Sequence, residues 1–394
     1  MATSSGEGKD VEVMSELPVA IAVPLMEDSF DEKIGAPSTS SNGKRKANGD
    51  HDVDPGDSGA GERQRGANGK ASSSGAGARM ESLEVEVKAK GSGSGGASGR
   101  KIKRYEDWPG NETFFCGGAC VTGPYYWGIL GTCLLILIPC CIYVGLVAFP
   151  LFDEFESDGD MPGGYVILVV SFALPCVSLI SLFCSGCMDP GIIPRAPPPQ
   201  ENVDHLSRTR NVEVNGHMVV VRYNETCNFY QPPRAHHCSV LNDCIERFDH
   251  YCPWVGTTIG KRNYRFYLVF VFSSSLLCIY TFACSAYLVK MRADGEDTSV
   301  AEALRKEPGA LFMMAYVFIC FWFVGGLSCF HIYLLSKNQT TYENIRYSYD
   351  RNSTNPYNRG CLVNWAEVFC VKVPERNCDF SAVVVESSRA EDES

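Results

Sequence analysis

A short polar stretch of the chain, Tyr223–Gly260, holds four cysteines and three histidines between long apolar runs. They are Cys227, His236, His237, Cys238, Cys244, His250 and Cys252. Cysteine and histidine at short spacing in a reducing compartment are typical zinc ligands. Cys227, His237 and Cys244 can converge on one ion from loops, and Cys238 is a candidate for the fourth ligand. No two cysteines of the stretch are separated by only two residues, so the spacing alone indicates metal only moderately.

The string Asp249-His250-Tyr251-Cys252 has a second possible chemistry, covalent catalysis. A cysteine attacks as a thiolate, and a histidine two residues away in a turn can take its proton. An aspartate beside that histidine can fix the tautomer and stabilise the imidazolium. Alone, the string is a weak indication, because all of these residues could simply support a zinc-binding fold.

Long apolar segments must position these residues. Four of them carry no Asp, Glu, Lys or Arg: Trp127–Leu151, Gly164–Cys187, Phe266–Val289 and Gly309–Ser336. Each exceeds the ~20 residues that a helix needs to cross ~30 Å of hydrocarbon, and only helices can cross singly. We therefore predict an all-α membrane protein with four transmembrane helices and a cytosolic, loop-rich, zinc-binding segment between the second and the third.

The charge of the connecting segments predicts the orientation. The segment Phe152–Gly163 has five acids and no Lys or Arg, whereas basic residues precede the first span and separate the second from the third. The positive-inside rule then places both termini and the cysteine-rich stretch in the cytosol. Basic residues in Lys290–Pro308 weaken this signal slightly. We expect an integral multi-pass protein of an endomembrane (Golgi or endoplasmic reticulum) or of the plasma membrane.

Composition excludes two other classes of protein. The chain has 394 residues and a net charge of −11, which is a poor match for nucleic acid. Its 19 cysteines do not indicate a secreted disulfide framework, because many lie inside the apolar segments. The first hundred residues are rich in Gly and Ser and are predicted to be disordered.

Several motifs together resemble one enzyme family. Cys227 through Phe270, with PPRAHHCS, ERFDHYCPWVG and GKRNYRFY, resembles the cysteine-rich domain of the DHHC-type protein S-acyltransferases (palmitoyltransferases), here as a DHYC variant. Asp189-Pro190-Gly191 matches the family's DPG motif, and Thr340-Thr341-Tyr342-Glu343 matches its TTxE motif. Asn355-Pro356-Tyr357 begins a stretch that resembles its C-terminal NPY motif. The four spans also follow the family's architecture.

The resemblance implies a role for each site residue. Cys252 takes a long-chain acyl group, such as palmitoyl, from acyl-CoA, His250 is its general base, and Asp249 orients His250. The acyl group then passes to a cysteine of a membrane-associated protein. Thr341 is expected to hydrogen-bond near Asp249, and Asn364 to brace the domain. Arg234 is a candidate for contact with the phosphates of CoA, although an ordinary surface charge is the commoner explanation.

The predicted organisation has five parts. They are a disordered cytosolic region (1–104), the first two helices with the DPG motif (105–200), the cysteine-rich catalytic domain (201–263), the last two helices (264–336) and a cytosolic C-terminal region with the TTxE and NPY motifs (337–394).

The sequence also departs from the family pattern. Tyr251 stands where the family has His, and Asn224, Leu241 and Thr258 stand where it has cysteines. One zinc site therefore keeps Cys227, His237 and Cys244, whereas the other keeps only Cys238. We expect about one zinc ion per chain.

Two other classes of protein are alternatives to an acyltransferase. A catalytically silent membrane scaffold, whose cysteine-rich domain only binds partners, is the main alternative, and the lost ligands are what favours it. A channel or transporter is weaker, because His331 is the one ionisable residue within the four spans.

Overall fold

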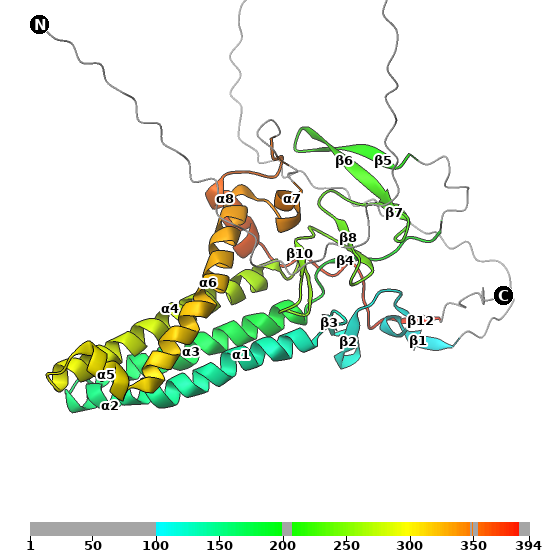
Figure 1. Ribbon diagram of the computed structural model, residues 1–394. Helices are drawn as coiled ribbons and strands as arrows, with labels where there is room; N and C mark the ends of the chain where they lie inside the picture. Colours follow the sequence, from blue (N-terminus) through cyan, green and yellow to red (C-terminus); the bar gives the residue numbers. More distant parts are fainter. Residues whose placement is uncertain (1–99, 199–206, 347–348, 350–353, 386–394) are drawn as a thin grey trace, which may run out of the picture. The chain divides into compact units, whose positions relative to one another are not determined.

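The computed structural model describes residues 100–198, 207–346, 349 and 354–385. Four helices within these ranges are long and apolar enough to cross a membrane, and they lie side by side in Figure 1. They are Trp127–Ser157, α3 (Met161–Gly186), α4 (Tyr264–Gly295) and α6 (Pro308–Lys337). Each corresponds to a predicted span and extends beyond it at one end or both.

The first spanning helix contains an irregular turn. α1 (Trp127–Tyr143) passes into the π-helical turn η4 (Val144–Ala148) and continues as α2 (Phe149–Ser157). Pro150 has no N–H for an α-helical bond, and the N–H of Phe149 bonds to Val144 five residues earlier. Because α2 continues to Ser157, most of the expected acidic loop is helical.

Ion pairs join the helices at the end of the bundle that carries α2 and α5 (Figure 1). α5 (Val300–Lys306) connects α4 to α6. Arg292 of α4 pairs with Glu154 of α2, and its Nε lies 3.2 Å from Oε1 of Glu307 at the start of α6. Arg292 is therefore held between acidic residues of two neighbouring elements.

Small polar side chains let the helices approach closely in the middle of the bundle. Ser178 of α3 donates a hydrogen bond to Ser273 of α4 at 2.9 Å. The hydroxyls of Ser275 in α4 and Ser328 in α6 lie 2.7 Å apart. Such contacts between small residues stabilise helix pairs in lipid, where burial of apolar surface gives little driving force.

Short strands correct the prediction of an all-α, loop-rich fold. Within the described residues three precede α1, and two of them, β2 (Thr113–Phe115) and β3 (Cys120–Thr122), flank the 3-10 turn η3 (Cys116–Gly118). Eight lie between α3 and α4: β4 (Ile192–Ile193), β5 (Thr209–Val214), β6 (His217–Asn224), β7 (Phe229–Tyr230), β8 (His236–Cys238), β9 (Asp243–Ile245), β10 (His250–Cys252) and β11 (Thr257–Ile259). They form the small antiparallel sheets β4-β9-β8, β5-β6-β7 and β10-β11.

Residues near both ends of the described chain form one more sheet. β1 (Lys101–Lys103) pairs antiparallel with β12 (Val383–Val385), and the 3-10 turn η2 (Arg104–Asp107) follows β1. Phe380 is fully buried, with its ring 4.9 Å from that of Trp108. Residues 101–104 are therefore ordered, contrary to the prediction for 1–104, because a distant strand satisfies their backbone. Residues 1–99 of that region lie outside the described residues.

The C-terminal region adds two short helices, α7 (Thr341–Ile345) and α8 (Cys361–Phe369). The TTxE motif begins α7 as a capping box. The side chain of Thr340 accepts from the N–H of Glu343, and the Glu343 carboxylate accepts from the N–H of Thr340 at 2.9 Å. The motif thus fixes the direction in which the chain leaves α6.

Candidate active site and metal site

The predicted nucleophile lies on the hairpin of β10 and β11. His250 pairs with Ile259 and Cys252 pairs with Thr257 across the two strands. Since side chains alternate along a strand, His250 and Cys252 share one face and Tyr251 points to the other. The sequence prediction placed this pair in a turn, but the two-residue repeat of a strand brings the side chains together equally well.

Asp249 is buried and its carboxylate is fully engaged. Oδ2 lies 2.7 Å from Nδ1 of His250, and Thr341 donates to the carboxylate through both its N–H and its hydroxyl, each at 2.8 Å. Burial alone would raise the pKa of Asp249, but the hydrogen bonds from His250 and Thr341 outweigh it. The pKa of Asp249 therefore lies well below its usual value, and the group is a carboxylate.

His250 stands between this carboxylate and the sulfur. Its Nδ1 faces Asp249, which leaves Nε2 for a hydrogen bond with Cys252. Burial opposes the charged ring, but the hydrogen bonds with Asp249 and Cys252 raise the pKa of His250 to about 10. The imidazole thus accepts a proton readily and, once charged, stabilises a neighbouring sulfur anion. Its side chain is 26% exposed, so a reactant can reach it.

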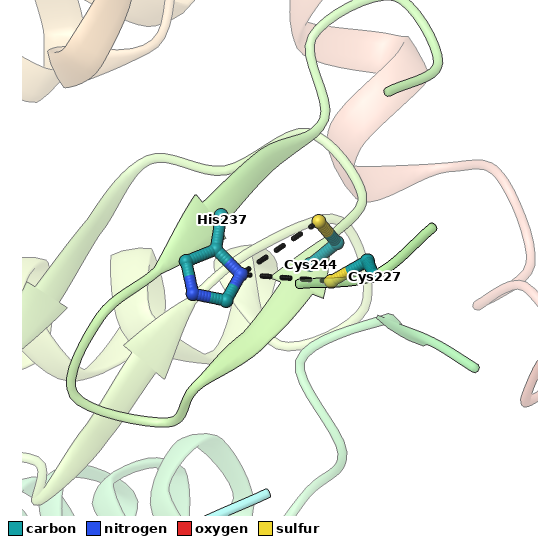
Figure 2. A group of neighbouring side chains, drawn as sticks. All are labelled: Cys227, His237 and Cys244. Atoms are coloured by element: carbon teal, nitrogen blue, oxygen red, sulfur yellow. Dashed lines mark hydrogen bonds between the residues drawn. The ribbon is translucent and has the colours of Figure 1, made fainter. Parts of the chain in front are cut away.

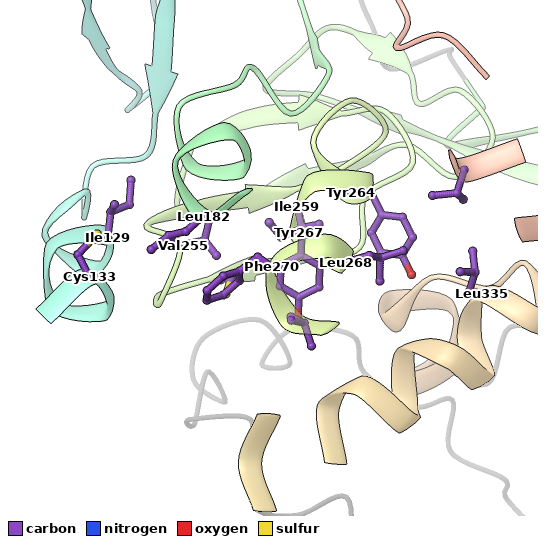
Figure 3. Packing of buried hydrophobic residues seen from close by; sticks show 13 residues of the cluster. Ile129, Cys133, Leu182, Val255, Ile259, Tyr264, Tyr267, Leu268, Phe270 and Leu335 are labelled. Carbon is purple, nitrogen blue, oxygen red and sulfur yellow. The ribbon is translucent and has the colours of Figure 1, made fainter. Parts of the chain in front are cut away.

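Cys252 belongs to a cluster of buried apolar side chains that come from several spanning helices, and Figure 3 shows the packing of this cluster. α1 contributes Ile129 and α3 contributes Leu182, both buried, while α6 contributes Leu335. Phe270 of α4 belongs to the same cluster. The reactive sulfur is therefore next to an apolar surface that is continuous with the interior of the bundle.

The loop that follows Cys252 lies directly on two of these helices. A Cβ atom on Gly128 of α1 would be only 1.8 Å from the carbonyl oxygen of Pro253, and one on Gly186 of α3 would be 2.9 Å from that of Val255. Thr132 of α1 also donates a hydrogen bond to the carbonyl of Trp254 at 2.7 Å. The helices therefore fix the position of the loop and of the sulfur that precedes it.

A second group of side chains has the chemistry of a metal site (Figure 2). Cys227, His237 and Cys244 place their ligand atoms within 4.8 Å of one another. Nδ1 of His237 lies 3.6 Å from the sulfur of Cys227 and 3.9 Å from that of Cys244. The hydrogen bond between the thiols lowers the pKa of Cys227 to about 5 and raises the pKa of Cys244. The pair thus favours the thiolate form of Cys227, the form in which cysteine binds a metal ion.

These distances fit a tetrahedral zinc ion. Zn–S bonds of ~2.3 Å and Zn–N bonds of ~2.0 Å separate a ligand sulfur from a ligand nitrogen by about 3.5 Å. Asn224, at the family's fourth ligand position, is engaged elsewhere, because its side-chain oxygen accepts from the N–H of Cys227 at 2.8 Å. Within the described residues the group thus offers three protein ligands.

Comparison with known proteins decides the family. A model of the DHHC palmitoyltransferase family matches residues 221–348. Protein S-acyltransferase 8 of Arabidopsis thaliana is 44% identical over 299 residues, which cover 72% of each chain. Probable protein S-acyltransferase 6 of the same plant is 43% identical over 297 residues, covering 72% of this chain and 71% of the relative.

The chain belongs to the DHHC palmitoyltransferase family. It is therefore an acyltransferase enzyme, and the sequence-based prediction of this activity is confirmed. The four membrane-spanning candidates make it a multi-pass membrane protein, also as predicted.

Packed side chains occupy the positions of the family's second zinc site in this palmitoyltransferase. The sulfur of Cys238 lies 3.1 Å from the hydroxyl of Thr258, and burial raises the pKa of that thiol. Cys238 and the fully buried Leu241 belong to one apolar cluster, and Tyr251 packs against this cluster. Cys238 therefore points away from His237, its neighbour on β8, and is not placed to be the fourth ligand of the first site.

Arg234 is turned inward in the palmitoyltransferase. Its Nε and Nη2 donate to the two carboxylate oxygens of Glu343, both at 2.8 Å, and its Nη1 donates to Asn338 at 3.0 Å. The guanidinium lies 4.3 Å from the ring centre of Tyr357, and only 8% of the side chain is exposed. This geometry contradicts the expected contact with CoA phosphates. Arg234 instead ties the cysteine-rich segment to the TTxE motif.

Asn364 links the C-terminal motif to the end of α6. It is buried, and its side-chain N–H groups donate to the carbonyl of Ser336 and to Asn358, both at 2.9 Å. Its oxygen accepts from the N–H of Arg359. These bonds connect α8 to the end of α6 and to the C-terminal motif.

Sequence analysis missed three residues beside the site. Tyr267 of α4 and His331 of α6 are buried next to His250, and Tyr264 of α4, also buried, contacts both of them. The available signal was His331 itself, because an ionisable residue inside a spanning helix is a functional candidate by default. The sequence does not show which helix packs against His331, so its position beside His250 could not be predicted.

Proposed function

We propose that Cys252 carries the acyl group between a long-chain acyl-CoA, such as palmitoyl-CoA, and a cysteine of a membrane-associated protein. The observation that supports this most directly is the order Asp249, His250 and Cys252 on one hairpin. Asp249 is hydrogen-bonded to His250, His250 interacts with Cys252, and Cys252 belongs to an apolar cluster. In this proposal Asp249 orients the base, His250 moves the proton and Cys252 is the nucleophile.

Each half-reaction exchanges one thioester for another. In the first, Cys252 has already passed its proton to His250, and the resulting thiolate attacks the acyl carbonyl carbon. The bond from that carbon to the CoA sulfur breaks, and the leaving sulfur takes the proton. In the second, a substrate thiol gives its proton to His250 and attacks the acyl–Cys252 thioester, which releases Cys252. One thioester bond breaks and one forms each time, so the protein mainly supplies orientation and proton transfer.

The spanning helices would hold the acyl chain. Burial of a methylene group contributes ~0.8 kcal/mol, so a chain of palmitoyl length gains strongly from an apolar slot. The cluster that includes Cys252 contains residues of α1, α3, α4 and α6, so apolar side chains of all four spanning helices lie close to the proposed nucleophile.

Cys227, His237 and Cys244 would hold one zinc ion in a structural role. Such an ion cross-links loop-rich chain by tetrahedral coordination to thiolate and imidazole. Here it would join the segment after β6 to β8 and β9, which lead directly into Asp249 and the catalytic hairpin. No step of the acyl transfer runs through the ion.

We further propose that both termini and the strands between α3 and α4 face the cytosol, in an endomembrane or the plasma membrane. Basic charge before α1 and between α3 and α4 supports this orientation. Glycosylation tags test it. A tag at Gly159, between α2 and α3, should be modified, and a tag at Gly216, in the turn between β5 and β6, should remain unmodified. The reverse pattern would overturn the orientation.

The test of the chemistry is acyl labelling of the purified enzyme. Wild-type protein incubated with palmitoyl-CoA should acquire a hydroxylamine-sensitive label on Cys252 and pass it to a cysteine-containing peptide. Cys252→Ser should lose both, and His250→Ala should slow labelling by about 10²–10⁴-fold through loss of the base. Transfer by Cys252→Ser at the wild-type rate would refute the assignment of the nucleophile.

A further inference from the structure

A buried histidine of α6 is hydrogen-bonded to two tyrosines of α4. Nδ1 of His331 lies 3.2 Å from the hydroxyl of Tyr264, and its Nε2 lies 3.2 Å from the hydroxyl of Tyr267. His331 and Tyr267 are each only 1% exposed. A neutral imidazole has one N–H donor and one acceptor nitrogen, so two hydroxyls satisfy it completely in either tautomer. The three side chains therefore form a closed unit with fixed orientations.

This unit lies against the ring of the catalytic histidine. The ring centre of Tyr267 is 5.3 Å from that of His250, with an angle of 68° between the rings, which is an edge-to-face contact. The ring of His331 is 6.2 Å from that of His250. Tyr267 and Cys252 also belong to the same buried cluster. Tyr267 thus borders the space in which His250 meets the sulfur.

The hydrogen bond to Asp249 does not by itself fix the ring of His250. It holds one atom, Nδ1, and leaves the ring free to rock about that contact, which would swing Nε2 away from Cys252. A rigid ring packed edge-to-face on His250 restricts this motion. Tyr267 can restrict His250 only if the orientation of its own ring is fixed. The hydrogen bond between its hydroxyl and His331 fixes that orientation.

We infer that Tyr264, Tyr267 and His331 are positioning residues that keep Nε2 of His250 aimed at Cys252. This inference rests on the proposed role of His250 as the base. It assigns a function in acyl transfer to two spanning helices, beyond enclosing the acyl chain. It also explains why an ionisable side chain stands inside α6, where a charge or an unpaired polar group is unfavourable.

A role limited to packing between α4 and α6 makes a different prediction for substitutions at His331. In an apolar interior, Leu replaces a buried ring better than Gln if only packing matters. If the hydrogen bonds matter, His331→Gln, which keeps a donor and an acceptor, should retain more activity than His331→Leu. The order of these two variants therefore separates the two roles.

The experiment measures acylation of Cys252 by palmitoyl-CoA in a single turnover with full-length protein in detergent. The rate constant at saturation, the half-saturating concentration and the thermal unfolding temperature are recorded for each variant. Tyr267→Phe, which keeps the ring and removes its anchor, should lower the rate constant about tenfold at an unchanged half-saturating concentration. His331→Leu should do the same, and His331→Gln should fall between it and wild type.

Tyr316→Phe is the matched control. Tyr316 also joins two helices, because its hydroxyl donates to the carbonyl of Leu135 at 2.8 Å, but it lies about four turns before His331 on α6. This variant should keep the wild-type rate constant within about twofold. If wild type is acylated and Tyr267→Phe matches Tyr316→Phe, or if His331→Leu exceeds His331→Gln, the positioning role is wrong. If wild type is not acylated on Cys252, the proposed function itself is wrong.

Discussion

Replacing Gly128 by Ala tests whether the spanning helices set the position of the catalytic loop. Gly128 is the second residue of α1, and its backbone is helical, so Ala introduces no backbone strain. The only change is one methyl group. That methyl would lie 1.8 Å from the carbonyl oxygen of Pro253, the residue after Cys252.

The size of the effect follows from this distance. Cβ atoms essentially never come closer than 3.0 Å to another heavy atom, so the loop or the helix must move by about 1.2 Å. A misplacement of about 1 Å at a reacting group can lower a rate about 10²-fold. We therefore expect acylation of Cys252 to slow by about 10²-fold. Overpacking should also lower the free energy of unfolding by about 1–3 kcal/mol.

Gly131→Ala is the control for this experiment. Gly131 lies one turn further along α1, and a Cβ on it would meet no heavy atom within 4 Å. This variant should keep the wild-type rate and gain slightly in helix stability. Single-turnover acylation with palmitoyl-CoA and thermal unfolding of both variants decide the question. Wild-type acylation by Gly128→Ala would show that the loop does not depend on α1 for its position.

Three further outcomes are expected. Since the pKa of His250 is raised from 6.5 to about 10, its pairing with Asp249 stabilises the fold fully below pH 6.5 and is lost as pH approaches 10. Thermal melts of wild type and Asp249→Asn should therefore converge with rising pH. Elemental analysis should find about one zinc per chain, lost in Cys244→Ser and retained in Cys238→Ser, and two ions per chain would contradict this. Tyr251→Phe should keep its activity and melt no lower than wild type, because within the described residues that buried hydroxyl has no hydrogen-bond partner.

The spanning helices and the order of the reactive residues could be predicted from sequence because both are local properties. Length and apolarity define a span without any partner. Likewise Asp249, His250 and Cys252 are near neighbours in the chain, so almost any local conformation keeps them within reach of one another.

The features that sequence reasoning missed depend on distant partners. The two residues of β4 form a strand only because they pair with β9. From sequence alone Arg234 is indistinguishable from a surface charge, because its partner Glu343 lies far along the chain. Likewise, the sequence does not show that His331 of α6 is hydrogen-bonded to two tyrosines of α4. The hairpin of β5 and β6 was the exception, since Asn215-Gly216 is a local turn signal that could have predicted it.

The pairing of β1 with β12 has a consequence for biogenesis. The ribosome delivers β1 before any spanning helix, whereas β12 follows all four of them in the chain. Phe380, which precedes β12 and contacts the rings of both Trp108 and Phe114, is therefore also synthesised after the four helices. These helices can enter the membrane in the meantime, but the sheet of β1 and β12 can close only afterwards. A chain that lacks Phe380 and β12 thus leaves more of these two aromatic rings exposed than the complete fold does.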